Sequence, residues 1–147
     1  MPSELPNAQD ASLAALGAAC DVVGDRWSLP VIGALLDGPL RYGELQARLP
    51  AIAPNILTAR LRKLEGDGLV VSSRYSARPP RFEYRVTADG AGLADVTRVL
   101  ASWSSRRAGA EHEQLVHDAC GSAIEVRWWC PTCEVAAAPN TGAPVFV

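Results

Sequence analysis

Two pairs of potential metal ligands lie near the C-terminal end of the sequence. Two residues separate His117 from Cys120 and Cys130 from Cys133, and nine residues lie between the pairs. Zinc in proteins takes four nitrogen or sulfur ligands in a tetrahedron, and two closely spaced pairs can supply them. Gly121 permits the left-handed turn that such a pair needs. The spacing therefore predicts a structural zinc site, and zinc is the one cofactor that the sequence indicates.

Two other interpretations of these residues remain open. The cysteines could be plain reduced thiols in a loose tail, or Cys130 and Cys133 could form a redox pair. A thioredoxin-type active site requires a βαβ setting, which the surrounding sequence lacks. No Lys or Arg precedes Arg26, so an export signal ending at Cys20 is not indicated and structural disulfides are not expected.

The segment from Pro54 to Glu65 carries a second set of side chains, suited to recognition. Helical spacing places Leu57, Leu61 and Leu64 on one face. The residues of this segment that we predict to contact DNA are Pro54, Asn55, Thr58, Ala59, Arg62 and Lys63. Asn and Arg side chains can pair bidentately with adenine and guanine in the major groove, and amides at a helix start can bind phosphate. Alternatively, these residues are the solvated side of a surface helix.

Basic residues are concentrated in the middle of the chain. The net charge is −2 over 147 residues, yet the region from Arg41 to Arg85 holds nine Lys or Arg and four acidic residues. A basic stripe on an otherwise acidic protein favours a phosphate-facing surface. Outside the helix above, the predicted DNA contacts are Arg41, Arg74, Arg78 and Arg81.

The spacing of apolar residues predicts the helices and strands that position these side chains. Apolar spacing predicts helices over residues 13–23, 27–36, 42–49 and 54–65, with Ser28 capping the second. Residues 69–71 and 82–86 are predicted strands, joined by a basic loop over 74–81, and a longer helix spans 90–107. Three helices before a two-stranded hairpin are typical of a winged helix-turn-helix. The expected fold class is α+β, mainly helical, with a small zinc-ribbon-like appendage at the C-terminal end.

Three regions follow from this organisation: a flexible arm over residues 1–11, a winged-helix domain over 12–109 and a Cys-rich tail over 110–147. No apolar run reaches the roughly 18–20 residues of a membrane span, so a cytoplasmic protein without a membrane partner is expected. No glycine-rich phosphate loop and no nucleophile with plausible partners is present. The sequence therefore does not predict an enzyme.

Several blocks between Leu16 and Trp103 have a specific order and spacing: Val23–Leu29, Leu36–Leu45, Ile52–Leu64, Asp67–Val70, Arg78–Tyr84, Leu93 and Trp103. In these blocks the segment resembles the HxlR-type winged-helix regulators of bacteria. The resemblance implies a homodimer joined by the first and last long helices, with the 54–65 helix as the reader, and control of nearby genes. The tail resembles the zinc-ribbon appendage of a subset of similar regulators.

The predicted dimer interface combines this resemblance with an apolar seam. Leu93, Val96, Leu100 and Trp103 recur in steps of three, four and three, as in a coiled coil. Together with two residues of the first helix, the predicted interface is Leu13, Leu16, Leu93, Val96, Leu100 and Trp103.

One position departs from the thiol-sensing members that this chain resembles. Those members carry a Cys about thirteen residues before the Trp that corresponds to Trp27, and here that position is Ala14. Cys20 is instead expected to pack in the core or an interface, since a free Cys behaves as a small apolar residue. The predicted function is sequence-specific DNA binding by a dimeric repressor, modulated by a small effector or by redox state. The alternative is a winged-helix module for protein contacts without operator binding.

Overall fold

The computed structural model describes residues 8–77, 80–108, 116–117, 119–122, 124 and 128–137. The chain divides into two compact units, residues 1–97 and 98–147. The predicted DNA contact Arg78 lies outside the described residues. Among the residues that are described, no helix is long and apolar enough to cross a membrane.

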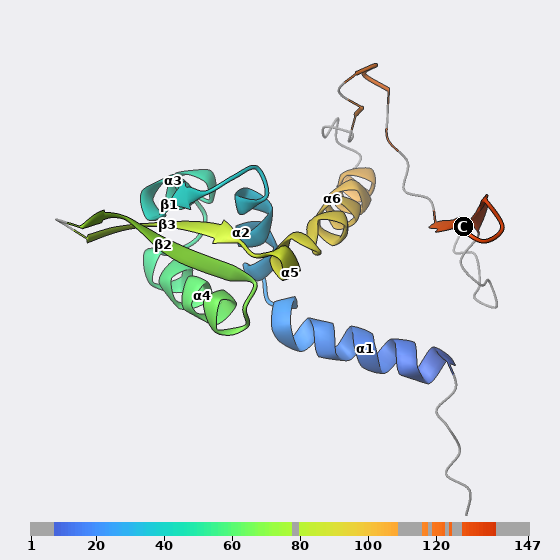
Figure 1. Ribbon diagram of the computed structural model, residues 1–147, viewed down its shortest axis with the longest axis horizontal. Coiled ribbons are helices and arrows are strands. Elements are labelled where there is room, and N and C mark those ends of the chain that lie inside the picture. Colours follow the sequence, from blue (N-terminus) through green and yellow to red (C-terminus); the bar gives the residue numbers. More distant parts are fainter. Residues whose placement is uncertain are drawn as a thin grey trace, which may run out of the picture. The chain divides into compact units, whose positions relative to one another are not determined.

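Helices build the first unit close to the predicted places, except that the first begins at Ala8, inside the region expected as a flexible arm over residues 1–11 (Figure 1). They are α1 (Ala8–Val23), α2 (Ser28–Leu35), α3 (Tyr42–Arg48) and α4 (Pro54–Gly66). The core consists mainly of side chains from α2, α3 and α4 and the turn before α4: Val31, Ile32, Leu35, Leu45, Ile52, Leu57, Leu61 and Leu64. The helical spacing of these apolar residues therefore predicted which faces turn inward.

The start of α2 differs from the prediction. Ser28 does not cap the helix, because Ser28 is buried and its hydroxyl donates to the carboxylate of Asp25. That carboxylate accepts hydrogen bonds from the amides of Trp27, at 2.8 Å, and Ser28, at 3.0 Å. A full negative charge beside the unpaired amides of a helix start is favourable. Asp25, rather than Ser28, therefore accepts the hydrogen bonds of the backbone amides at the start of α2.

A three-stranded antiparallel sheet of order β1-β3-β2 completes the first unit. Its strands are β1 (Leu40–Arg41), β2 (Val70–Ala77) and β3 (Pro80–Val86). The hairpin of β2 and β3 projects beyond the helices as a wing (Figure 1). The prediction of a basic loop over 74–81 is wrong for most of its length, since the pairing runs out to Ala77 and Pro80. Ladder hydrogen bonds to a neighbouring strand hold polar residues in a conformation that apolar patterning alone does not indicate.

A glycine ends α4 and turns the chain into the wing. Gly68 has φ +73°, the left-handed region that favours glycine. The amide of Leu69 donates to the carbonyl of Leu64 at 2.9 Å, and the amide of Gly68 to that of Glu65 at 3.1 Å. These two bonds form a Schellman motif, which satisfies the last carbonyls of the helix.

The long helix predicted over residues 90–107 is two helices, α5 (Ala88–Ala91) and α6 (Ala94–Ala108). Thr87 caps α5 by accepting a hydrogen bond from the amide of Gly90 at 3.1 Å. Leu93 lies between the two helices and packs, half-buried, against the core of the first unit. Leu93 is therefore a core-flanking residue of the protomer, and the apolar seam of α6 starts at Val96.

The second unit contains a short hairpin of β4 (Trp128–Cys130) and β5 (Val135–Ala137). The two strands are antiparallel, with Cys130 opposite Val135. Part of the strand expected before Cys130, residues 125–127, lies outside the described residues. The turn between the strands contains Cys133, so the second predicted ligand pair lies at the tip of this hairpin.

A substitution at Gly90 is expected to destabilise the first unit. A Cβ at this position would overlap the backbone carbonyl of Leu69, which already accepts a hydrogen bond from the amide of Thr87. Neither backbone segment can move without breaking that bond, so Gly90→Ala should lower the free energy of unfolding by about 1–3 kcal/mol. Urea denaturation measures this value. Gly66→Ala is the control, because open space surrounds that position. Equal stability of the two variants would contradict the close approach of α5 to the backbone of Leu69.

Candidate nucleic-acid interface

The exposed face of α4 carries the residue types that read DNA bases. Leu57, Leu61 and Leu64 are buried, while Asn55 and Arg62 are exposed. Pro54 and Ala59 are exposed with them. The predicted orientation of the helix is thus confirmed, and its polar face is accessible to a partner.

Thr58 is a predicted DNA contact that the structure places in a packing role. It is half-buried, and its hydroxyl donates to the carbonyl of Pro54 at 3.0 Å and lies 3.2 Å from the hydroxyl of Tyr42. The Tyr42 hydroxyl also donates to the Pro54 carbonyl, at 2.7 Å. These bonds tie the start of α3 to the first turn of α4. Tyr42 was not predicted as a site residue, and no local pattern marks it.

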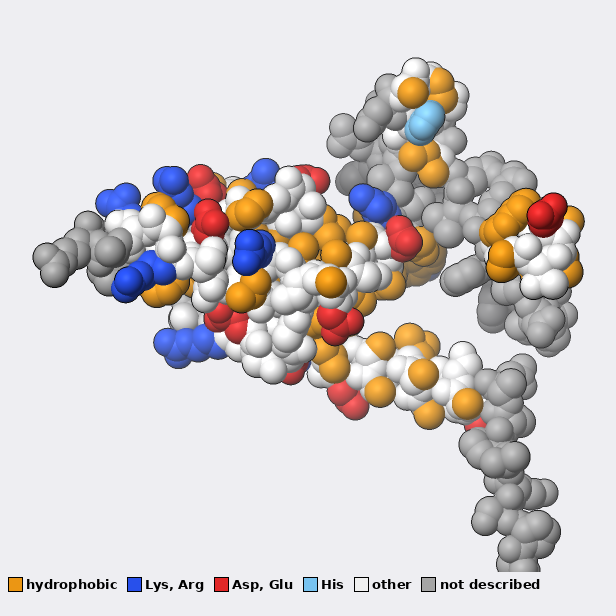
Figure 2. Space-filling model, viewed as in Figure 1, with side chains coloured by type: hydrophobic (Ala, Val, Ile, Leu, Met, Phe, Trp, Pro, Cys, Tyr) orange, Lys and Arg blue, Asp and Glu red, His pale blue; other side chains and the backbone are white. Residues whose placement is uncertain are grey.

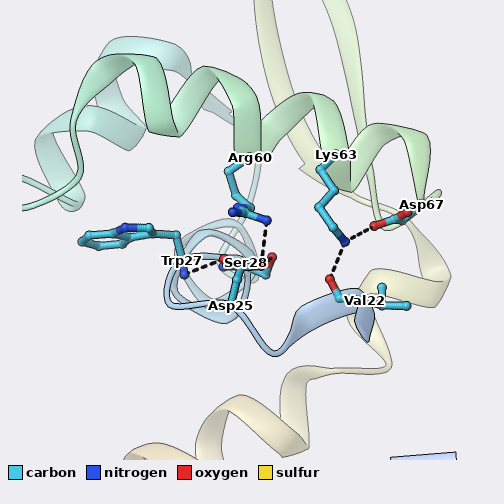
Figure 3. A network of polar contacts seen from close by, with 7 residues as sticks. All are labelled: Val22, Asp25, Trp27, Ser28, Arg60, Lys63 and Asp67. Carbon is cyan, nitrogen blue, oxygen red and sulfur yellow. Dashed lines mark hydrogen bonds and ion pairs between the residues drawn. The ribbon is translucent and has the colours of Figure 1, made fainter. Parts of the chain in front are cut away.

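Lys63 points toward the end of α1 (Figure 3). Its Nζ donates to the carbonyl of Val22 at 2.6 Å and to the carboxylate of Asp67 at 2.7 Å. This ammonium, predicted to contact DNA beside Asn55 and Arg62, is therefore paired within the protein, which the sequence did not indicate. The reason is that Val22 lies 41 residues earlier in the chain, so helical spacing within α4 cannot indicate this contact.

A second polar contact joins α4 to the turn before α2 (Figure 3). The guanidinium of Arg60 lies 2.7 Å from the carboxylate of Asp25. Burial raises the pKa of Asp25, but hydrogen bonds from the Ser28 hydroxyl and from the Trp27 and Ser28 amides, with the charge of Arg60, outweigh it. The pKa of Asp25 is therefore below its ordinary value of 3.8. Asp25 and Lys63 thus hold the helix that carries the polar face against the preceding elements.

The stabilisation from Asp25 is expected to depend on pH. Asp25→Asn should lower the free energy of unfolding by about 1–2 kcal/mol at neutral pH, since the helix start and Arg60 lose the charged acceptor. Because the pKa of Asp25 is lowered in the folded protein, its contribution is present above 3.8 and is lost as the pH falls through the folded-state pKa. In urea denaturation, wild type and variant should therefore converge as the pH falls below 3.8 and through the lowered folded-state pKa.

Asp37→Asn is the matched control for this experiment. Its carboxylate is 81% exposed and lies 3.5 Å from Arg48. An exposed pair at that distance contributes little, so stability should hardly change. A constant difference between wild type and Asp25→Asn across the pH range would contradict the role of the ionised carboxylate.

The wing and the start of α3 bring further basic side chains together. Arg41, Arg74 and Arg81 are exposed, and the guanidinium of Arg41 lies 4.5 Å from the ring centre of Tyr75. Arg41, Tyr75 and Arg81 line one hollow of about 450 Å³, with Phe82 and the first residues of α3. Figure 2 shows Lys and Arg side chains over the wing end of the first unit, with acidic side chains among them. The wing thus presents cations beside aromatic rings.

Residues predicted for a dimer interface are exposed on two helices. Leu13 and Leu16 lie on α1, and Val96, Leu100 and Trp103 on α6. These large apolar side chains are 43–67% exposed. Cys20 is also exposed, so its packing in the protomer core is not seen. Both helices thus expose large apolar side chains.

The predicted metal ligands form two separate pairs. Nδ1 of His117 lies 3.3 Å from Sγ of Cys120, and Cys130 and Cys133 lie at the tip of the β4–β5 hairpin. Within the described part of the chain, no three His, Cys, Asp or Glu side chains gather as a metal site. Hydrogen bonds from the side chain and the amide of Ser122 lower the pKa of Cys120. All four cysteines of the chain are free thiols.

Comparisons with known proteins agree with this architecture. The family model described as HxlR-like helix-turn-helix matches residues 22–112. YtcD of Bacillus subtilis, an HTH-type transcriptional regulator, is 32% identical over 108 residues, which cover 74% of this chain and 82% of YtcD. The HTH-type transcriptional regulator Rv3095 of Mycobacterium tuberculosis is 34% identical over 121 residues, covering 80% of this chain and 76% of Rv3095.

Solved structures include similar proteins with the same fold. The oxidized form of the redox regulator HypR matches with a TM-score of 0.59 and 30% identity over 63% of this chain and 95% of HypR. The reduced form of the transcriptional regulator YodB from B. subtilis matches with a TM-score of 0.55 and 28% identity over 63% of this chain and 90% of YodB. The family model spans the last two residues of α1 and everything from α2 through the wing to the end of α6. This chain is a winged-helix transcription regulator of the HxlR-like helix-turn-helix family.

Proposed function

We propose that this protein binds operator DNA as a homodimer and represses nearby genes. The observation that carries the proposal is the exposed polar face of α4, where Asn55 and Arg62 stand clear of the buried leucines. A helix of this kind fits the major groove, and its Asn and Arg side chains pair with base edges. Arg74 and Arg81 on the wing contact the adjacent phosphates.

The dimer follows from the exposed apolar side chains of α1 and α6. Leucine, valine and tryptophan side chains on these two helices are exposed in the described part of the chain, and a second copy would cover them. A symmetric dimer presents two copies of α4 to a near-palindromic site. Each α4 then reads one half-site.

DNA binding is modulated by a small effector or by redox state. HypR is a redox regulator solved in oxidized and reduced forms, and YodB has been solved with quinone bound. The modulating chemistry of this chain differs from that of the thiol-sensing members it resembles, because Ala14 stands where they carry a Cys.

Selection of bound sites from random DNA tests the proposal. The expected result is one enriched near-palindromic sequence, bound by the purified protein in a gel-shift assay and released at higher salt. Repeating the selection with an oxidant or a quinone tests the modulation. Binding without any enriched sequence, or no binding to DNA, would contradict operator recognition and favour a protein-interaction module.

A further inference from the structure

The second unit contains two turns with the same local geometry. The residue after Cys120 is Gly121, with φ +68°, and the residue after Cys133 is Glu134, with φ +51°. A left-handed conformation is uncommon for a residue with a side chain, and Glu134 is the one non-glycine residue with positive φ in the described part of the chain. In both the His-x2-Cys and the Cys-x2-Cys segment, the residue after the last potential ligand thus has a left-handed backbone conformation.

Backbone hydrogen bonds close both turns. In the first turn, the amides of Cys120 and Gly121 donate to the carbonyl of His117 at 3.1 and 2.7 Å, and the amide of His117 donates to the carbonyl of Ser122 at 2.8 Å. In the second turn, β4 and β5 pair out to Cys130 and Val135. Each turn therefore holds its two potential ligands close together in the chain.

The spacing within each pair suits tetrahedral ligation. With Zn–N about 2.0–2.1 Å and Zn–S about 2.3 Å, two ligands of one zinc ion lie about 3.5–3.8 Å apart. The Nδ1 of His117 and the Sγ of Cys120 lie 3.3 Å apart. Cys130 is the last residue of β4, and Cys133 lies in the turn of the β4–β5 hairpin. The first turn thus presents two ligands near the separation that one ion requires, and the second carries its pair at the same sequence spacing.

We propose that His117, Cys120, Cys130 and Cys133 bind one Zn²⁺ ion, which joins the two turns into a zinc ribbon. Binding releases the protons of the three thiols to solvent, and the neutral imidazole completes a closed tetrahedron. A closed site has no open position for water or substrate, so its role is structural. The metal draws together two turns whose large apolar side chains, among them Val116, Ile124, Trp129 and Val135, are otherwise exposed.

Metal analysis of the full chain, purified under reducing conditions, tests the site. Wild-type protein is expected to carry about one zinc ion per chain. Replacing the zinc with Co²⁺ should produce the visible bands of tetrahedral cobalt and a sulfur-to-cobalt charge-transfer band. Removing the metal should change the fluorescence of Trp129, which lies beside Cys130.

Three variants at two of the proposed ligands, with two controls, identify the ligand set. Cys133→Ser and His117→Ala should weaken cobalt binding by about tenfold or more, since each removes one ligand. His117→Cys should restore binding and strengthen the charge-transfer band, because a fourth thiolate replaces the imidazole. Cys20→Ser and His112→Ala are matched controls at the remaining Cys and His of the chain and should bind cobalt as wild type does.

Three results would overturn the proposal: metal-free protein that does not take up cobalt, a Cys130–Cys133 disulfide in the reduced preparation, or equal binding by wild type and Cys133→Ser. Retained binding in His117→Ala would overturn the assigned ligand set. The first unit has its own buried core, so operator binding is measured separately on the same variants. A ligand variant that loses zinc but still binds operator DNA would show that the metal site and DNA recognition are separate. Wild-type protein that binds zinc but no operator would contradict the proposed function and leave the metal site intact.

Discussion

Replacing Asn55 and Arg62 together by alanine is expected to remove most of the discrimination between operator and unrelated DNA. Each side chain is exposed on α4, and each good bidentate contact to a base contributes about 1–3 kcal/mol of discrimination. The buried face of the helix does not change, so the fold should remain intact. Binding isotherms on the selected site and on a scrambled duplex at one salt concentration measure the ratio.

A wing substitution is the matched comparison for the reading helix. Arg74→Ala removes an exposed cation from β2. A phosphate contact carries no sequence information, so this variant should bind all duplexes more weakly by a similar factor. The dependence of log K on log salt should become shallower by about one. If the Asn55 and Arg62 double variant kept the wild-type ratio, α4 would not be the reading helix.

Trp103→Ala is expected to shift the protein from dimer to monomer. Trp103 is 52% exposed in the protomer, and its ring is contacted by the guanidinium of Arg107 at 5.2 Å. If a partner subunit covers the rest of the ring, its removal costs about 3–5 kcal/mol of packing in the dimer. Sedimentation equilibrium over a range of protein concentrations measures the change in dissociation constant.

Trp129→Ala is the control for this experiment, since it removes an equally large, exposed ring from β4 rather than from α6. Its oligomeric state should match wild type.

A dimer also predicts two reading helices about 34–36 Å apart, or a multiple of that distance, along the DNA. Wild-type protein that is monomeric at micromolar concentration would contradict the interface.

Local periodicity in the sequence predicted the helices and the faces they bury. Leu57, Leu61 and Leu64 share one side of a helix because 3.6 residues make a turn, whatever lies elsewhere in the chain. The same geometry places Asn55 and Arg62 on the opposite side, where the structure exposes them. The polar face of α4 could therefore be predicted from thirteen consecutive residues.

The partners of the flanking side chains could not be predicted in this way. Lys63 and Thr58 border the same polar face, yet Lys63 bonds to Val22 and Thr58 to Tyr42. Leu93 continues the apolar spacing of α6, yet a break after α5 turns it toward the core. Helical spacing determines the side of a helix on which a residue lies. Contacts between residues far apart in sequence depend on how the elements pack, and only the tertiary structure decides them.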